Sequence, residues 1–289
     1  MALPLLIILI MASACAPGAE ASPSASSQRA IQNKGSDTLV NLALAWAETY
    51  QRANAGVSIA VAGGGTGSGV AALINGTVDI ANASRPMTDD EIAAARANGI
   101  EPVRFTVAID ALAVIVHPDN PVSQLTIDQL SDMFTGRVTN WKDVGGNDAP
   151  IVLLSRELNS GTHVYFLEEV LRKGDKTNKD IFAPQTLLML SSVGITSEIR
   201  RNPNAIGYDG LGYITPEEKV IAVARDSHSP YVRASVETGA DGSYPLARPL
   251  YMYTAGEPTG EIAAYIDWIR GPEGQKLVAD LGFVPITPE

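Results

Sequence analysis

Apolar residues follow a helical spacing in some segments of the chain and an extended spacing in others. From Leu39 to Tyr50 they recur every three or four residues, which predicts a helix with one buried face. Residues 57–62 have the composition of a strand, and a glycine-rich loop, a short apolar helix and a strand at 78–81 follow. This succession is typical of the βαβ units of α/β proteins.

Two predicted helix starts have the form of a capping box. Thr88 precedes Glu91, and Thr126 precedes Gln129, each by three positions. In this arrangement the Thr hydroxyl accepts from the backbone N–H three residues on, and the longer side chain reaches back to the Thr N–H. Each box predicts a helix that ends at the next glycine.

The rest of the chain continues the alternation of strands and helices without an internal repeat. The pattern predicts strands at 103–107, 111–116, 151–154, 205–208 and 250–253, and helices at 160–173, 191–201, 260–269 and 272–281. We expect an α/β protein of two lobes, with 114–118 and 248–251 as the best candidates for the connections between them.

The N-terminal segment has the features of an export signal. Residues 3–14 form an apolar run that is too short to span a bilayer, and Cys15 follows directly. The surrounding residues resemble the lipobox of bacterial lipoproteins, which implies that Cys15 is lipidated and that 1–15 is a signal peptide. Residues 16–30 are rich in Ser, Ala and Pro and predict a flexible tether. A buried first strand is the alternative, and this low-complexity segment weakens it.

The charge balance limits the kinds of partner. The chain of 289 residues has a formal net charge of −11, so it lacks the excess of Lys and Arg that nucleic acids or anionic membranes require. A small anion remains compatible with this charge, because backbone N–H groups and a single Arg can bind it locally.

The sequence contains few of the groups that catalysis needs. There is one Cys and there are three His, and neither a Gly-x-Ser-x-Gly nor a His-Glu-x-x-His motif is present. His163 lies next to the candidate site described below, and we expect it to face outward from its helix. The sequence therefore predicts a binding protein without a metal or cofactor, with hydrolase activity as the weaker alternative.

Three segments place Ser, Thr and Gly at the expected start of a helix, namely 35–38, 63–69 and 156–162. Unpaired N–H groups and the helix dipole favour an anion at such positions. A capping Ser or Thr also has a purely structural use, so no single segment decides the matter. The glycine loop has neither the Lys-Ser/Thr of a P-loop nor the glycine pattern of a dinucleotide site, and a flexible linker is its alternative.

Residues 34–86 and 156–166 resemble the periplasmic phosphate-binding proteins of bacterial ABC transporters, and the likeness extends from about residue 31 to the end. Its most specific motif is Arg-x-x-x-Ser-Gly-Thr, which begins here at Arg156. The resemblance implies a type II periplasmic-binding-protein fold, with a ligand cleft between two lobes and a two-strand hinge. Residues 31–115 and 250–289 would form lobe I, and 116–249 lobe II.

The family's phosphate contacts can be transferred to matching positions. The motif at 156–162 supplies a guanidinium and N–H and O–H donors at a helix start. The turn at 35–38 and the glycine loop at 63–69 supply further donors. The loop after 76–80 supplies the fourth contact. The resemblance places contacts at Ser36, Thr38, Thr66, Ser84, Arg156, Ser160, Gly161 and Thr162, and the neighbouring residues Asp37, Ser68 and Arg85 are further candidates.

Ser84 departs from the family pattern. Some members carry there an Asp that accepts the proton of hydrogen phosphate, which sulfate does not offer. Discrimination against sulfate is therefore weaker in this chain or is supplied by Asp37. The alternative role of Asp37 is that of a simple helix cap. Arg85 is either a second cationic contact or the partner of Asp89, four residues later.

The resemblance implies a monomer that captures inorganic phosphate in the periplasm or on the outer face of the cytoplasmic membrane and delivers it to an ABC permease. Two alternatives stay open. The ligand can be another oxyanion, such as sulfate, molybdate or tungstate, or the protein can be a phosphate sensor or surface protein without a role in transport.

Overall fold

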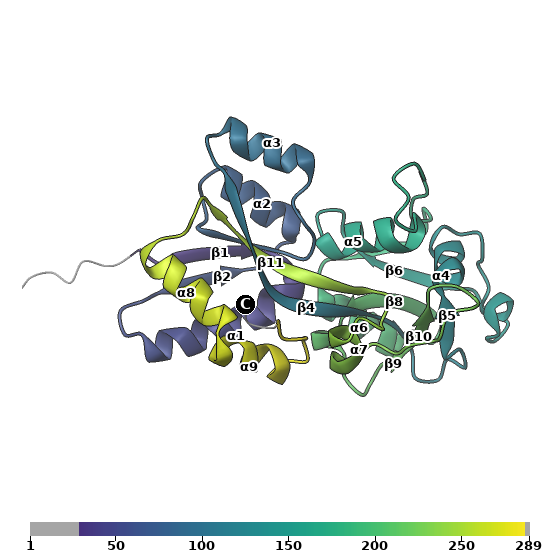
Figure 1. Ribbon diagram of the computed structural model, residues 1–289. Helices are drawn as coiled ribbons and strands as arrows, with labels where there is room; N and C mark the ends of the chain where they lie inside the picture. The colour runs from purple at the N-terminus through teal and green to yellow at the C-terminus, as the bar shows by residue number, and fades with distance from the viewer. Residues whose placement is uncertain (1–28, 287–289) are drawn as a thin grey trace, which may run out of the picture.

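Two lobes joined by a pair of long strands make up the computed structural model, which describes residues 29–286 (Figure 1). The strands that run from one lobe into the other are β4 (Pro102–Val116) and β11 (Ala247–Ala255). Cys15, the predicted signal peptide and nearly all of the predicted tether lie outside the described residues. Within 29–286, no helix is long and apolar enough to cross a membrane.

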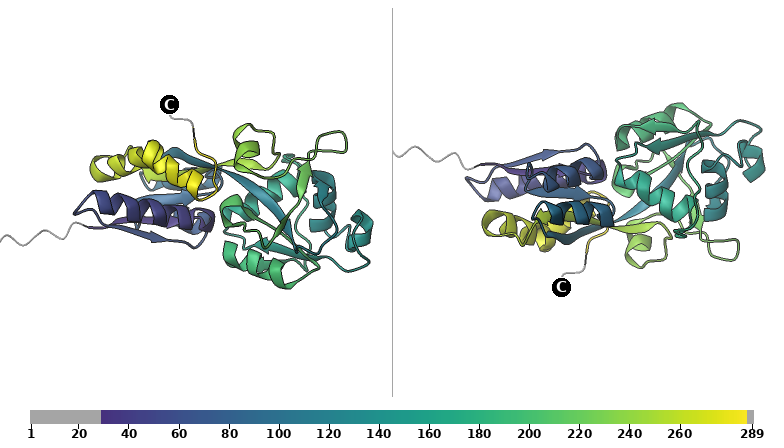
Figure 2. Two further views of the ribbon diagram at one scale, coloured as in Figure 1. Left: turned by 90° about the horizontal axis from the view of Figure 1, so that it is seen from below. Right: turned by 90° about the horizontal axis from the view of Figure 1, so that it is seen from above.

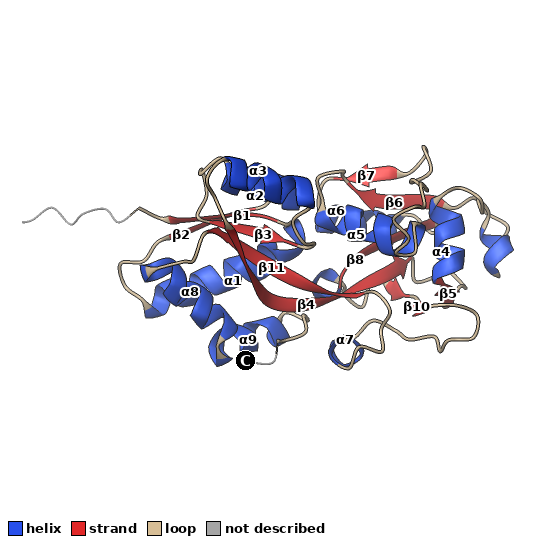
Figure 3. Cartoon of the chain, turned by 45° about the horizontal axis from the view of Figure 1, so that its top comes forward, coloured by secondary structure: helices blue, strands red, loops and turns tan. Residues whose placement is uncertain are grey.

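The first lobe holds the start and the end of the described chain around one sheet. Its strands lie in the order β2, β1, β3, β11 and β4, with β1 parallel to β2 and β3, and β11 antiparallel to both neighbours. Helices cover both faces of this sheet (Figure 3). The elements are β1 (Ile31–Gly35), α1 (Asp37–Ala53), β2 (Ile59–Ala62), α2 (Thr66–Ile74), β3 (Ile80–Ala83), α3 (Asp89–Ala97), α8 (Gly260–Arg270) and α9 (Pro272–Asp280).

The second lobe continues the sheet from the far half of β4 through β8, β6 and β7. A short pair, β5 and β10, lies apart from it. The two views of Figure 2 show this lobe beside the first, connected through the crossing strands. Its elements are β5 (Gln124–Thr126), α4 (Ile127–Phe134), η1 (Trp141–Val144), β6 (Val152–Arg156), α5 (Gly161–Phe166), η2 (Leu167–Leu171), β7 (Leu187–Met189), α6 (Ser192–Arg201), β8 (Ala205–Gly210), η3 (Leu211–Tyr213), β9 (Lys219–Val220), β10 (Ala222–Ala224) and α7 (Val236–Ala240).

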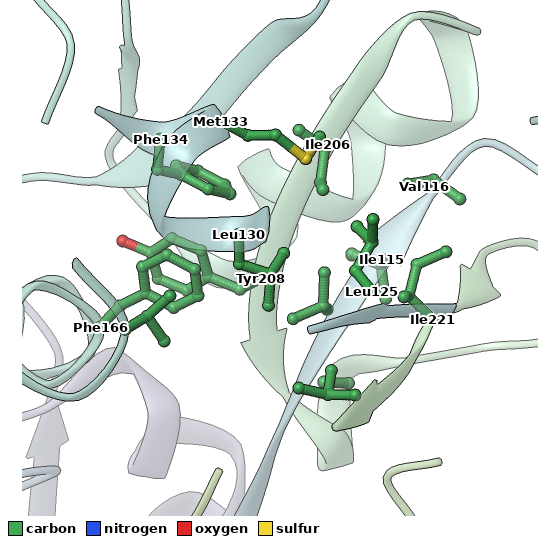
Figure 4. Packing of buried hydrophobic residues seen from close by; sticks show 14 of the residues in the cluster. Ile115, Val116, Leu125, Leu130, Met133, Phe134, Phe166, Ile206, Tyr208 and Ile221 are labelled. Carbon is green, nitrogen blue, oxygen red and sulfur yellow. The ribbon is translucent and has the colours of Figure 1, made fainter. Parts of the chain in front are cut away.

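The second lobe has one buried apolar cluster, and the first lobe has two. In the second lobe the rings of Phe166 and Tyr208 stack with centroids 3.7 Å apart, and Phe134 packs edge-on against both (Figure 4). Along β4, Ala108 packs in one of the first-lobe clusters and Ala111 in that of the second lobe. The strand therefore crosses from one lobe to the other between Ala108 and Ala111, on the N-terminal side of the predicted connection 114–118. The lobe boundaries at 115/116 and 249/250 stay a prediction.

Most predicted elements exist, and both capping boxes are confirmed. The segments 103–107 and 111–116 are one strand, because the charge of Asp110 that interrupts the apolar pattern is buried against Arg248. The sequence missed β1, which lies inside the sheet between β2 and β3, and it also missed the short elements β5, β7, β9, β10 and α7. The helix predicted at 160–173 is shorter, with α5 passing into a wider π-type turn at η2.

Candidate anion-binding site

Residues at the N-termini of three helices meet between the lobes: α1 and α2 come from the first lobe and α5 from the second. The entry into α1 depends on Gly35, which has a φ of +148° and whose added Cβ would overlap the Asn82 carbonyl oxygen. The Ser36 N–H donates to that same oxygen. Since free N–H groups at helix starts attract anions, three converging helix starts form a candidate oxyanion site.

The two lobes touch directly at this place. The Thr38 and Thr162 hydroxyl oxygens are 2.9 Å apart, and the Gly67 N–H donates to the Asn159 carbonyl at 3.0 Å. A Cβ on Gly161 would lie 2.5 Å from both Thr66 Oγ1 and Ser84 Oγ. The structure therefore has the lobes closed on one another, with Gly161 as a close contact between them.

Arg156 is fully buried at the end of β6. Its Nη2 donates to Asp37 Oδ2 at 2.8 Å and to the Leu190 carbonyl at 3.1 Å. Its Nε and Nη1 donate to the Met189 carbonyl and to Ser192 Oγ, both at 3.2 Å. A guanidinium has five N–H donors. The bonds seen among the described residues therefore leave one N–H of Nη1 for a ligand.

Asp37 connects this cation to the glycine loop. Its Oδ1 accepts from the Gly64 N–H at 2.9 Å, and its backbone carbonyl accepts from the Tyr213 hydroxyl at 2.5 Å. The cap of α1 is Ser36, whose side chain makes no capping hydrogen bond. The interpretation of Asp37 as a simple helix cap is therefore wrong, because its carboxylate bonds groups outside α1.

The remaining predicted hydroxyls are buried at the same interface. Thr66 Oγ1 accepts from the Ser84 N–H at 3.1 Å and lies 3.3 Å from Ser84 Oγ. Ser160 caps α5 by accepting from the Thr162 N–H at 3.2 Å. The sequence thus identified side chains from both lobes that the fold brings together.

Two predicted phosphate contacts, Ser68 and Arg85, hydrogen-bond to other groups of the protein. Ser68 Oγ lies 2.6 Å from the Gly64 carbonyl within its own loop, and it donates there. Both Nη atoms of Arg85 donate to Glu91 at 2.7 Å. The partner predicted for Arg85, Asp89, is therefore wrong, since Glu91 of the capping box occupies that role.

The sequence missed one buried ion pair beside these residues. Arg248 on β11 and Asp110 on β4 face each other in register, with Nη2 and Oδ2 3.0 Å apart. Arg248 Nη2 also donates to Thr162 Oγ1 at 2.8 Å, and its Nη1 to the Ser84 carbonyl at 3.0 Å. The available signal was a charge within each of two apolar strands, because buried charges need partners.

Besides Asp37 and Asp110, a third carboxylate, that of Asp209, lies close to Arg156. Its Oδ1 accepts from Ser192 Oγ at 2.8 Å and from the Gly210 N–H. Desolvation by burial raises the pKa of Asp209 to about 6, although the positive charge of Arg156 opposes the shift. Arg156 and its surroundings are therefore sensitive to the charge on Asp209.

We expect Asp209→Asn to flatten the pH dependence of folding stability between pH 4 and 6. Because the folded-state pKa of about 6 exceeds the ordinary value of 3.8 for an aspartate, the folded protein binds more protons in this window and loses stability as the pH rises. Relative to the variant, the wild type should lose up to about 3 kcal/mol. Urea unfolding at several pH values measures this, and parallel stability curves for the two proteins would contradict it.

His163 faces the interior of the second lobe, so the prediction that it faces outward is wrong. Its ring stacks on Phe182 with centroids 4.5 Å apart, and its Nδ1 lies 3.0 Å from Ser155 Oγ. Burial lowers the pKa of His163. Ser155 is fully buried and its hydroxyl also lies 2.5 Å from the Tyr208 hydroxyl. This Ser–His contact is therefore part of the buried interior of the second lobe.

Comparison with known proteins relates the chain to phosphate-binding proteins. Residues 20–273 match a family model described as a PBP superfamily domain. The chain is 34% identical over 273 residues to the phosphate-binding protein PstS of Pseudomonas aeruginosa, covering 89% of this chain and 83% of that protein. It is 30% identical over 291 residues to the PstS of Bacillus subtilis, covering 96% and 91%.

Solved structures agree with the predicted fold class. A phosphate ABC transporter substrate-binding protein from Clostridium perfringens, solved with bound phosphate, aligns with a TM-score of 0.80 and 31% identity, covering 90% of this chain and all of that one. An ABC-type phosphate transport receptor from Vibrio cholerae aligns with a TM-score of 0.70 and 29% identity, covering 89% and 100%. The α/β, two-lobed binding-protein fold predicted from the sequence is confirmed.

Proposed function

Because the chain belongs to the PBP superfamily and, within it, to the PstS-type phosphate-binding proteins, we propose that it captures inorganic phosphate between its lobes and delivers it to an ABC permease. One observation carries this proposal most directly. A fully buried Arg156 lies where side chains from three helix starts of both lobes converge. This combination suits a small, dehydrated, tetrahedral anion.

The proposed phosphate contacts are the free N–H of Arg156, the amides at the helix starts and the hydroxyls gathered around them. Ser68 and Arg85 would lie at the rim, because the loop carbonyls and Glu91 already hold their polar groups. The inner contacts would be Ser36, Thr38, Thr66, Ser84, Arg156, Ser160, Gly161 and Thr162, with Asp37 as the acceptor of the phosphate proton.

Charge balance within the site explains how an acidic protein can hold an anion. Arg156 is paired with Asp37, and Arg248 with Asp110, so neither guanidinium adds a net positive charge to the buried site. The anion would be held by directed N–H and O–H donors and by helix dipoles, whose effect is short-ranged. The net charge of −11 is compatible with this arrangement.

The lobes would act as two rigid bodies, 31–115 with 250–289 and 116–249, that rotate about β4 and β11. The anion would stabilise the closed form because only that form brings donors from both lobes to it. We further propose a monomer without catalytic activity, exported and held at the membrane through a lipid on Cys15. The lipobox-like sequence supports the lipid, and the family supports export and the permease partner.

A panel of oxyanions tests the proposed ligand. Thermal unfolding of the purified protein is followed with phosphate, sulfate, molybdate or tungstate at equal concentration. A ligand at about 100 times its Kd stabilises a protein by about 2.7 kcal/mol, which is several degrees in Tm at this size. We expect phosphate to give the largest shift. A larger shift with another oxyanion would change the ligand, and no shift with any of them would refute the function.

Asp37→Asn is expected to reduce the preference for phosphate over sulfate by about tenfold or more, because a charge-assisted hydrogen bond from the phosphate proton is lost. Asp37 has lone pairs beyond those that Arg156 and Gly64 use, so it can accept this proton. Competition binding of sulfate against phosphate measures the preference.

Asp89→Asn is the matched control, since Asp89 also begins a helix in the first lobe but is exposed. It should leave the preference unchanged. If Asp37→Asn kept the full preference of the wild type, Asp37 would be excluded as the discriminating acceptor.

A further inference from the structure

Arg248 occupies a position at which both crossing strands and both lobes meet. It is 2% exposed, and its partner Asp110 is fully buried. The pair joins β11 to β4, while the Nη1 bond reaches the Ser84 carbonyl in the first lobe and the Nη2 bond reaches Thr162 in the second. No other arginine of the candidate site contacts both crossing strands and a hydroxyl of α5.

The orientation of this guanidinium is fixed from several sides. Its Nε and Nη2 both donate to Asp110 Oδ2, at 3.2 and 3.0 Å. Its central carbon lies 5.0 Å from the centroid of the Tyr165 ring, within cation–π distance. Asp110 is held in turn by the Leu211 N–H, which donates to Oδ1 at 3.1 Å. The N–H that points at Thr162 is therefore not free to turn away.

This contact determines which way the hydrogen of a threonine hydroxyl can point. A guanidinium only donates, so Thr162 Oγ1 must accept from Arg248 and must direct its own hydrogen elsewhere. The neighbouring hydroxyl is that of Thr38, 2.9 Å away. Whichever threonine donates to the other, one hydroxyl hydrogen of the pair is left for a third group, and Arg248 cannot take it.

We propose that Arg248, held by Asp110, is a positioning residue for anion binding, which orients the hydroxyl pair of Thr162 and Thr38 so that its one remaining hydrogen points toward the bound anion. This inference rests on the proposed function. It predicts that Arg248 contributes to affinity through Thr162 rather than through its own charge, which Asp110 balances. A purely structural role for the pair would instead be to neutralise Asp110 and hold the two crossing strands together.

A mutational cycle separates the two roles. The first change is Arg248→Met together with Asp110→Asn, which removes the ion pair without leaving a buried charge. The second is Thr162→Val, which removes the hydroxyl at nearly constant shape. The Kd for inorganic phosphate is measured by calorimetry for the wild type, both variants and their combination. Circular dichroism and thermal unfolding show which proteins are folded.

We expect the paired change to raise the Kd by about tenfold or more when Thr162 is present, the range for a hydrogen bond to a charged group. In the Thr162→Val background the same change should alter the Kd by less than about twofold, because contacts that act as a unit are not additive. Equal losses in both backgrounds, or no loss in either, would overturn the positioning role.

Two further variants keep the test decisive. Arg248→Lys retains the charge beside Asp110 but not the fork, and it replaces the paired change in the cycle if that variant does not fold. Arg104→Met removes an arginine from β4, the strand that carries Asp110, where its guanidinium lies over Tyr251, and it should leave the Kd unchanged. If the wild type bound no phosphate, the proposed function would fail together with this inference, whereas additive losses would refute only the role of Arg248.

Discussion

Replacing Arg156 with Met is expected to raise the Kd for phosphate by at least about 30-fold, which corresponds to about 2 kcal/mol or more. Arg156 is the only guanidinium in the described chain that joins the start of α1 to β6 across the lobes. Methionine keeps the apolar stem of the side chain but none of its donors. A dehydrated anion would then lose its main cationic contact in the closed form.

Arg137→Met provides the matched control for this substitution. Arg137 lies in the same lobe and pairs with Asp132 and Asp180, but its side chain is 49% exposed. Calorimetric titration of both variants should show weak binding only for Arg156→Met, with circular dichroism confirming that both are folded. An unchanged Kd for Arg156→Met would show that the anion is bound elsewhere.

Gly161→Ala is expected to weaken phosphate binding by about 5- to 150-fold, because overpacking a close contact costs about 1–3 kcal/mol. The new Cβ would lie 2.5 Å from Thr66 Oγ1 and from Ser84 Oγ in the closed form. Opening of the lobes relieves the clash, so Tm without phosphate should change little. Solution scattering should show that the variant becomes compact only at higher phosphate concentrations than the wild type.

Gly67→Ala tests whether the effect is specific to that contact. Gly67 also faces the opposite lobe, but a Cβ there would meet the Asn159 carbonyl oxygen at 3.4 Å, an ordinary van der Waals distance. This variant should close on phosphate as the wild type does. Normal closure and affinity in Gly161→Ala would contradict the interlobe contact described here.

The parts of the fold that depend on local chemistry could be predicted from the sequence. The capping boxes at Thr88 and Thr126 satisfy helix N–H groups within a few residues, so their pattern is sufficient evidence. The same holds for α5, whose start at Ser160 belongs to a motif with a recognisable spacing. Helix starts rich in Ser, Thr and Gly therefore identified the lobe surfaces that form the site.

The parts that depend on distant pairs could not be predicted in this way. Asp110 and Arg248 are 138 positions apart, and each looks like a break in an apolar strand until the other is placed beside it. Arg85 pairs with Glu91 because the capping box already holds that carboxylate near the start of α3. The burial of His163 likewise depends on Phe182 and Ser155, which the helical pattern of its own segment does not reveal.

Calorimetric titration of the wild-type protein with phosphate, alone and in an excess of sulfate, tests the central claim most directly. The protein is first freed of endogenous ligand by unfolding and refolding. A saturable binding heat with one site per chain, and a Kd that sulfate hardly alters, is the result predicted for a closed site in which Arg156 and three helix starts hold the anion and Asp37 accepts the phosphate proton. Absence of binding heat, or displacement of phosphate by equal sulfate, would contradict it.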